Sequence, residues 1–254
     1  MPLPHVIAIS NRKGGTGKTT VSVNLAAELA LRGRRVLLVD LDTQGHCAVG
    51  VGMTVSRTDA TVHNIFTDPD VRLSTIVRDT TFANLAIAPA DQRFEHDAGN
   101  RDDRRLSRAL AEEDITQRFD VVILDTPPSL DNLLLNALTA ANWLLVPYVP
   151  HHLSLEGVRQ LMRVLFKVKS GSNQGLKILG FLPTSAAENI RLHRTVTSEV
   201  GRQFGAIRVL DGIRNDIRLA EAFMAGKPIR HYAPTSRGAQ DFSDLADYVA
   251  ATLA

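Results

Sequence analysis

The sequence is poor in several features that mark whole classes of protein. Its 254 residues contain one cysteine, Cys47, which excludes an internal disulfide and, by itself, a four-ligand metal or iron–sulfur site. No apolar run approaches the roughly 18 residues of a transmembrane helix. The N-terminal stretch MPLPHVIAIS lacks the basic start and long apolar segment of a signal peptide. These absences predict a cytoplasmic protein, in which Cys47 is a small packing residue.

Net charge is also small, although the charges are unevenly distributed. The chain carries 29 Lys/Arg and 27 Asp/Glu, but residues 157–240 contain 14 basic and only 5 acidic side chains. A solvated surface is the ordinary explanation of a charge run, yet an excess of this size also indicates a polyanionic partner, most often nucleic acid. Aromatic residues make up 5% of the sequence and rarely interleave with these charges, so base stacking on single strands is not indicated.

Six apolar runs of strand length recur along the chain. They are continuous rather than alternating, which is typical of strands buried on both faces. Strands that alternate with helical patterns predict an α/β fold, a doubly wound and mostly parallel sheet with helices on both faces. Without repeats or Pro/Gly/Ser-rich linkers, residues 1–254 are expected to form a single domain. The expected strands are 5–10, 35–41, 84–90, 119–125, 142–148 and 177–183.

Apolar residues at helical spacing fill several of the intervals. One helix is expected after residue 18, another over 153–168, and a last one over 241–254. The last one carries acids and no Lys or Arg, so it is expected to pack on the core and not on a membrane surface, which favours basic flanks. The polar segment 91–118 is expected to be a surface helix with loops. The apolar positions are Val21, Leu25 and Leu29; Leu153, Val158, Leu161, Val164, Leu165 and Val168; and Phe242, Leu245, Ala246, Val249 and Leu253.

Residues 10–20, SNRKGGTGKTT, have the form of a phosphate-binding loop, except that Arg12 stands where G-x-x-x-x-G-K-S/T requires its first glycine. The stretch follows an expected strand and precedes an expected helix, which is the context such a loop needs. Its glycines let successive backbone N–H groups converge on one anion. Lys18 is predicted to pair with the β- and γ-phosphates of a nucleotide and Thr19 to bind Mg²⁺. The predicted nucleotide contacts are Lys13, Gly14, Gly15, Thr16, Gly17, Lys18, Thr19 and Thr20.

Two other expected strands end in carboxylates. Asp40 and Asp42 lie two residues apart and face the same side of an extended segment, and Asp125 ends the apolar run FDVVILD in the manner of a Walker B strand. At the carboxyl ends of parallel strands, these groups would line the ligand crevice beside the glycine loop. Asp125 is predicted to hold Mg²⁺ through water, because this ion keeps several waters.

The stretch K-G-G-T-G-K-T-T, residues 13–20, resembles the deviant Walker A motif of the ParA/MinD family of dimeric ATPases. Many members of that family lack the first glycine. The resemblance implies that Lys13 reaches across a two-fold interface to the nucleotide of the partner subunit, and that Lys13, Lys18 and Asp42 are catalytic. D-L-D-T-Q-G resembles switch I of the family, although Thr43 replaces the usual Pro, and T-P-P after Asp125 resembles switch II. The implied Mg²⁺ site comprises Thr19, Asp40, Asp42 and Asp125, with Asp42 orienting the attacking water.

Residues 213–240, IRNDIRLAEAFMAGKPIRHYAPTSRGAQ, resemble the ParA branch, in which R-L-x-E-A, G-K-P-I, Y-x-P and S-x-G-A recur in this order. In that branch the basic residues of this region contact DNA without reading its sequence. The resemblance is to the short form without an N-terminal helix-turn-helix, since the first strand is expected near residue 5. The implied DNA contacts are Arg218 first, then Arg214, Lys227, Arg230 and Arg237, with Arg191 and Arg194 as weaker candidates.

The resemblance implies an ATPase that requires ATP and Mg²⁺ and forms a homodimer when ATP-bound. The dimer would bind nonspecific double-stranded DNA of the nucleoid until a cargo-bound stimulating protein, ParB-like or an adaptor, triggers hydrolysis. The cargo could be a plasmid, a chromosome, or a protein assembly such as a chemotaxis cluster or carboxysome.

Two alternatives share the glycine loop. One is a MinD-like, membrane-associated regulator of division-site or flagellar placement, against which the acidic last helix argues. The other is a reductase like the nitrogenase iron protein. It needs two cysteines in each subunit to hold a cluster between subunits, and this chain has one.

Overall fold

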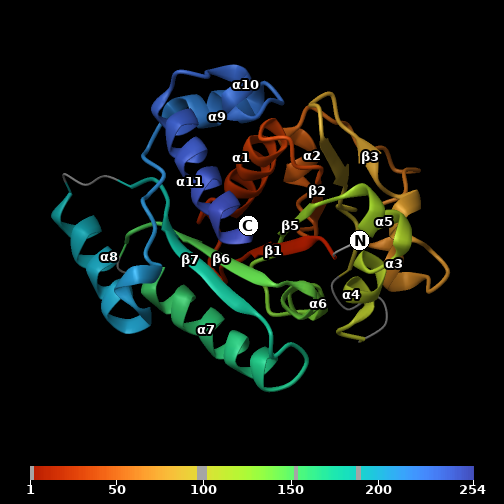
Figure 1. The fold of residues 1–254 in the computed structure, drawn as a ribbon, viewed down its shortest axis with the longest axis horizontal. Helices are drawn as coiled ribbons and strands as arrows, with labels where there is room; N and C mark the ends of the chain where they lie inside the picture. The colour runs from red at the N-terminus through yellow and green to blue at the C-terminus, as the bar shows by residue number, and fades with distance from the viewer. Residues whose placement is uncertain (1–2, 96–101, 152–153, 187–189) are drawn as a thin grey trace.

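The computed structural model describes residues 3–95, 102–151, 154–186 and 190–254, which form a seven-stranded sheet between two layers of helices (Figure 1). The strand order is β3-β4-β2-β5-β1-β6-β7, and every neighbouring pair is parallel except β3 with β4. This arrangement confirms the predicted doubly wound, mostly parallel α/β fold. The strands are β1 (His5–Ile9), β2 (Val36–Asp40), β3 (Arg78–Asp79), β4 (Leu85–Ala88), β5 (Val121–Asp125), β6 (Trp143–Tyr148) and β7 (Lys177–Pro183).

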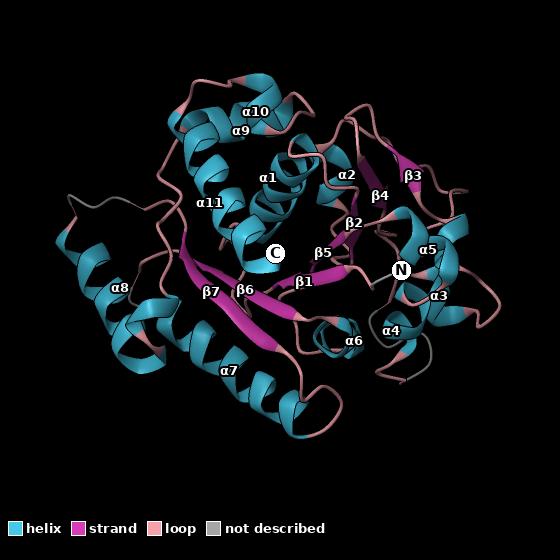
Figure 2. Cartoon of the chain, in the orientation of Figure 1, coloured by secondary structure: helices cyan, strands magenta, loops and turns pink. Residues whose placement is uncertain are grey.

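Side chains of the central strands alternate between two hydrophobic cores, one on each face of the sheet. In β1, Val6 and Ala8 belong to one core, whereas Ile7 and Ile9 belong to the other. Helices α6 and α7 cover the first face and α1 and α11 the second (Figures 1 and 2). Continuous apolar runs are therefore what this sheet requires, since both faces of each central strand are buried.

The helices on the two faces differ widely in length, from single turns to four or more turns. The longest are α7 and α11, both amphipathic, and α1 follows the glycine loop directly. The helices are α1 (Lys18–Leu31), α2 (His46–Gly50), α3 (Asn64–Thr67), α4 (Arg105–Leu110), α5 (Glu113–Arg118), α6 (Asn132–Ala140), α7 (Ser154–Ser170), α8 (Arg191–Phe204), α9 (Ile217–Met224), α10 (Ile229–Tyr232) and α11 (Arg237–Leu253), with 3-10 turns η1 (Leu73–Thr75) and η2 (Ala206–Arg208).

All six expected strands are present, five with slightly shorter bounds and β7 with the expected bounds, and the expected helices correspond to α1, α7 and α11. The five apolar residues predicted for the last helix are buried, so α11 packs on the core as expected. The two-residue strand β3 was not predicted, because it is too short to form an apolar run. The expectation for 91–118 was incomplete, since α4 and α5 bury one face, including Leu106 and Ile115. Leu153 lies outside the described residues.

Candidate functional site

The glycine loop lies at the carboxyl end of β1, and its backbone adopts conformations that only glycine takes without strain. Gly15 and Gly17 have φ angles of 72° and 80°, in the left-handed region. A Cβ added to Gly14 or Gly15 would meet no atom within 4 Å, so this side of the loop is open. Opposite it, the Thr184 hydroxyl donates to the Thr16 carbonyl over 2.9 Å and braces the loop against the end of β7. The loop is therefore held in place and open on one side, an arrangement that suits the binding of a phosphate group.

Lys18 begins α1 and is 7% exposed. Burial lowers the pKa of its ammonium, while the nearby carboxylates of Asp125 and Asp42 oppose that shift. A buried ammonium group beside carboxylates, at the base of a glycine loop, suits the binding of a phosphate.

The carboxylates of Asp40 and Asp125 meet at the floor of the site, because parallel strands β2 and β5 pair these two residues in register. Both side chains are fully buried. Burial raises the pKa of Asp40 well above its usual range, and the charge of Asp125 raises it further. Burial also raises the pKa of Asp125, against hydrogen bonds from Thr19 and Ser22, which donate over 2.7 and 2.9 Å. Two buried carboxylates that face each other favour a cation or a proton between them.

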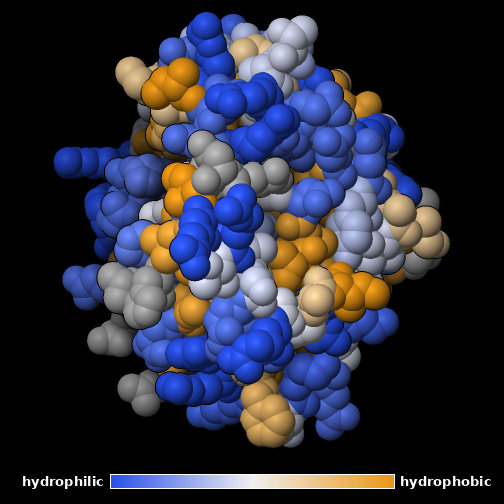
Figure 3. Space-filling view, turned by 90° about the vertical axis from the view of Figure 1, so that its left-hand side faces the viewer, coloured by the Kyte–Doolittle hydropathy of each residue, from blue (hydrophilic) through white to orange (hydrophobic). Residues whose placement is uncertain are grey.

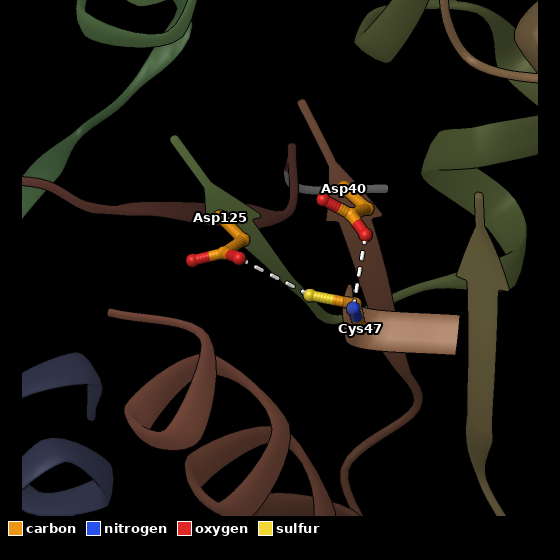
Figure 4. Close-up of side chains that lie close together, drawn as sticks. All are labelled: Asp40, Cys47 and Asp125. Carbon is orange, nitrogen blue, oxygen red and sulfur yellow. Dashed lines mark hydrogen bonds between the residues drawn. The ribbon is translucent and has the colours of Figure 1, made fainter. Parts of the chain in front are cut away.

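Cys47, at the start of α2, connects these two carboxylates. Its backbone N–H donates to Asp40 Oδ2 over 3.0 Å, and its Sγ donates to Asp125 Oδ2 over 3.3 Å (Figure 4). Burial raises the pKa of the thiol well above its usual range, so it remains a donor. The expectation of a small packing residue was incomplete, since Cys47 is buried but also hydrogen-bonds within the polar floor of the site.

Asp42 lies above this floor and is half-buried. Its amide donates to Asp40 Oδ1 over 3.2 Å, and its own Oδ1 accepts from the amide of Gln44 over 3.1 Å. A side chain that bonds the backbone two residues ahead closes a tight turn of its own. The turn that resembles switch I is therefore held by Asp40 and Asp42 themselves.

The segment that resembles switch II leaves β5 in the same crevice. The Thr126 hydroxyl donates to the Ile9 carbonyl over 2.9 Å, which ties the segment to the end of β1. Pro127 and Pro128 follow, and Asp131 caps α6 by accepting from the Leu134 amide. The three motifs therefore meet at the carboxyl ends of the adjacent strands β2, β5 and β1.

Beside the loop lies a cleft of about 520 Å³ that sequence reasoning did not find. Gly17, Thr19 and Thr20 form one wall, and Leu219 and Phe223 of α9 contribute to the other. The sequence alone predicts only DNA contacts for the segment 213–224. No local pattern reveals that the segment also lines this cleft, because the cleft exists only once α9 packs beside α2.

The predicted DNA contacts separate into distinct groups. Arg218 is exposed and pairs with Glu221 over 2.8 Å, and Arg214 pairs with Asp241 over 2.6 Å. Arg237 donates to the Asn215 carbonyl, and Lys227 is exposed. Arg191 and Arg194 lie on α8, which Figure 1 shows apart from α9 and α10. The side of the molecule that carries α8 is largely hydrophilic (Figure 3).

Arg230 differs from the other candidates in its ion-pair partner, which is an almost fully buried glutamate of α1. Its Nε pairs with Glu28 over 2.7 Å, and its two terminal nitrogens donate to the carbonyls of Pro234 and Ala239. Glu28 is 2% exposed and also pairs with Arg32. These contacts join α1, which carries Lys18, to the segment that follows α9.

Within the described residues, no helix combines the length and the apolar character needed to cross a membrane. Residues 4–178 match the family model described as an AAA domain. Soj from Bacillus subtilis, a sporulation initiation inhibitor protein, is 40% identical over 97% of this chain and 98% of its own length. The chromosome-partitioning ATPase Soj from Thermus thermophilus is 39% identical over 97% and 96% of the two chains.

Among solved structures, the septum site-determining protein MinD of Pyrococcus horikoshii, complexed with Mg-ADP, superposes with a TM-score of 0.79. It is 27% identical, and the match covers 99% of both chains. The glycine loop with its early lysine, the paired aspartates and these full-length similarities lead to one conclusion: the chain belongs to the ParA/MinD family of P-loop ATPases.

Proposed function

We propose that the protein is a ParA-type ATPase whose two subunits enclose ATP between them and, in that state, bind nonspecific double-stranded DNA. The observation that carries this proposal is the convergence of Lys13, Lys18, Asp42 and the Asp40–Asp125 pair at the ends of three adjacent strands. One seven-stranded sheet carrying both cores supports a single domain over residues 1–254.

The floor of the site fits a divalent cation. Two buried carboxylates face each other, and burial raises the pKa of both, so a cation between them and the phosphates would relieve an unfavourable arrangement. Thr19, Asp40 and Asp125 would hold Mg²⁺, with Asp42 nearby, and the bound ion would neutralise charge on the β- and γ-phosphates. Lys18 binds the same phosphates, and Asp42 orients the water that attacks the γ-phosphate.

The cleft beside the loop is the proposed site of the nucleoside. It opens next to Thr19 and Thr20, which lie where the phosphates of a bound nucleotide would end. The apolar side chains of Leu219 and Phe223 provide a surface for a planar base, and Asn215 and Asp216 supply polar groups at its rim. Pockets that combine an apolar wall with a few polar groups are typical of such sites.

Nucleotide state and DNA binding are proposed to be linked through α2 and α9. The ring of His46, in α2, meets Phe223 edge to face at 6.2 Å, and a Cβ on Gly52 would lie 2.8 Å from the Gly226 carbonyl oxygen. The switch I turn at Asp42 leads directly into α2. A change in that turn would therefore move α9, which carries Arg218, the first of the proposed DNA contacts.

The Soj relative from Thermus thermophilus is a chromosome-partitioning ATPase, which supports a chromosome as the cargo. For that cargo, we propose a ParB-like stimulating protein as the partner. A MinD-like membrane role is the second candidate. The burial of the apolar face of α11 argues against it, because that face is not available to a bilayer. Pelleting with anionic liposomes in ATP would support the membrane role, and sedimentation only with DNA would support the first proposal.

The experiment that tests the proposed function measures binding of the full chain to random-sequence duplex DNA with Mg-ATP, with Mg-ADP and without nucleotide. Strong, salt-sensitive binding only with ATP is expected, because many phosphate contacts are made by basic side chains. Lys18→Ala, which is expected not to bind nucleotide, is the negative control. Lys167→Ala, which changes an exposed lysine of α7, is the matched control. Equal binding with ADP and ATP would contradict the proposal.

A further inference from the structure

The backbone of Lys13 is fixed at both ends by side chains of its own loop. Its N–H donates to Asn11 Oδ1 over 3.0 Å, and its carbonyl accepts from the Thr16 hydroxyl over 3.3 Å. A lysine that must reach a neighbouring subunit has a long and flexible side chain, so the direction in which its backbone sends that side chain is decisive.

Asn11 is itself held rigidly. It is fully buried, and its Nδ2 donates to the carbonyl of Pro147, near the end of β6, over 2.8 Å. Its carboxamide therefore connects the carboxyl end of β6 with the Lys13 amide. With the donor and the acceptor of the group both engaged, it has one orientation.

Helix α7 packs against Asn11 and Lys13 through Gly157. A Cβ added to Gly157 would lie 2.9 Å from Asn11 Oδ1 and 3.1 Å from Lys13 Cβ, both closer than ordinary contact. Glycine is less favourable than alanine inside a helix, and the φ angle of Gly157 is not in the left-handed region. The close approach to the loop is therefore the physical reason for glycine at this position.

We propose that Asn11 and Gly157 are positioning residues for Lys13. Asn11 fixes the Lys13 amide, and Gly157 lets α7 approach closely enough to form a wall behind the first carbon of the lysine side chain. Together they direct that side chain out of its own subunit, toward the nucleotide of the partner. This inference rests on the proposed role of Lys13 across the dimer interface.

The test uses Gly157→Ala in the full chain and measures the dissociation constant of the ATP-bound dimer by analytical ultracentrifugation. We expect it to rise about tenfold or more, since small displacements of a reacting group have large effects. The affinity of the monomer for Mg-ADP should stay within about twofold, because Lys18 and the glycines remain in place. Gly171→Ala is the matched control, since its Cβ would meet only the Lys167 carbonyl at 3.6 Å.

A double-mutant cycle distinguishes positioning from a general structural effect. In a Lys13→Ala background, Gly157→Ala should add little to the loss of dimerisation, because the group it positions is gone. Asn11→Ala, which removes the acceptor of the Lys13 amide, should reproduce the effect and serves as the second variant if Gly157→Ala does not fold.

Three results would overturn the inference: wild-type dimerisation of the tested variant, an equal loss of ADP binding, or full additivity with Lys13→Ala. The Lys13→Ala variant alone tests the proposed function in the same experiment. If Lys13→Ala itself dimerises like wild type, the role of Lys13 across the interface fails and this inference fails with it. If only Lys13→Ala is impaired, the proposed function stands and the positioning role does not.

Discussion

Asp40 and Asp125 pair in register at the carboxyl ends of β2 and β5, and Cys47 donates to both of them from the start of α2. The two carboxylates come from the segments that resemble switch I and the Walker B strand. Because they share one buried space, a cation that enters it contacts both segments at once. On the proposed function, this buried floor is where the metal ion and the phosphates of the nucleotide would meet.

Asp125→Asn removes one of the two facing charges. We expect the Mg²⁺ concentration for half-maximal ATP hydrolysis to rise about tenfold or more, because carboxylate oxygens are the ligands this ion prefers. A Mg²⁺ titration of activity measures this effect. Asp120→Asn is the control. It changes a carboxylate that pairs with Arg35 and directly precedes β5, away from the site. An unchanged Mg²⁺ requirement would remove Asp125 from the metal site.

Asp42→Ala should separate ATP binding from hydrolysis. Without the carboxylate that orients water, the turnover number is expected to fall about a hundredfold or more, while ATP still binds through Lys18 and the glycine loop. The ATP-bound dimer should therefore accumulate. Phosphate release and sedimentation, recorded on the same sample, report both quantities. Turnover equal to wild type would show that another group orients the water.

Arg218→Ala is predicted to weaken DNA binding uniformly across sequences. The side chain is exposed and pairs with Glu221 at the surface, so a phosphate can replace that partner. The slope of log affinity against log salt should fall by about one, as expected for the loss of one phosphate contact. Binding isotherms on random duplex DNA at several salt concentrations give this slope. An identical slope would place Arg218 outside the interface.

Arg230→Ala is predicted to act on stability instead. The variant leaves Glu28 buried with Arg32 as its remaining partner, so the free energy of unfolding should fall by about 3 kcal/mol. Chemical denaturation measures the change, and Lys227→Ala, an exposed neighbour, is the control. If the free energy of unfolding is unchanged and DNA affinity falls, Arg230 binds DNA and does not stabilise the fold through Glu28.

Much of the arrangement of the site was predictable, because the motifs that form it are short stretches of consecutive residues. The glycine loop, Lys18, Asp42 and Asp125 each lie at the end of an apolar run, and parallel pairing brings strand ends together. The cleft beside the glycine loop, the ion pair of Arg230 with Glu28 and the hydrogen bond from the Cys47 thiol were not predictable. Each depends on which helix packs beside which: α9 beside α2, α10 beside α1, and α2 over the end of β5. The spacing of residues within one segment carries no information on such contacts.

The central claim is that Lys13 makes nucleotide binding and dimerisation interdependent. Sedimentation of wild type and Lys13→Ala with Mg-ATP, each at saturating nucleotide, tests it most directly. We expect a dimer for wild type and a much weaker dimer, with ATP still bound, for Lys13→Ala. A Lys13→Ala dimer as stable as that of wild type would contradict it.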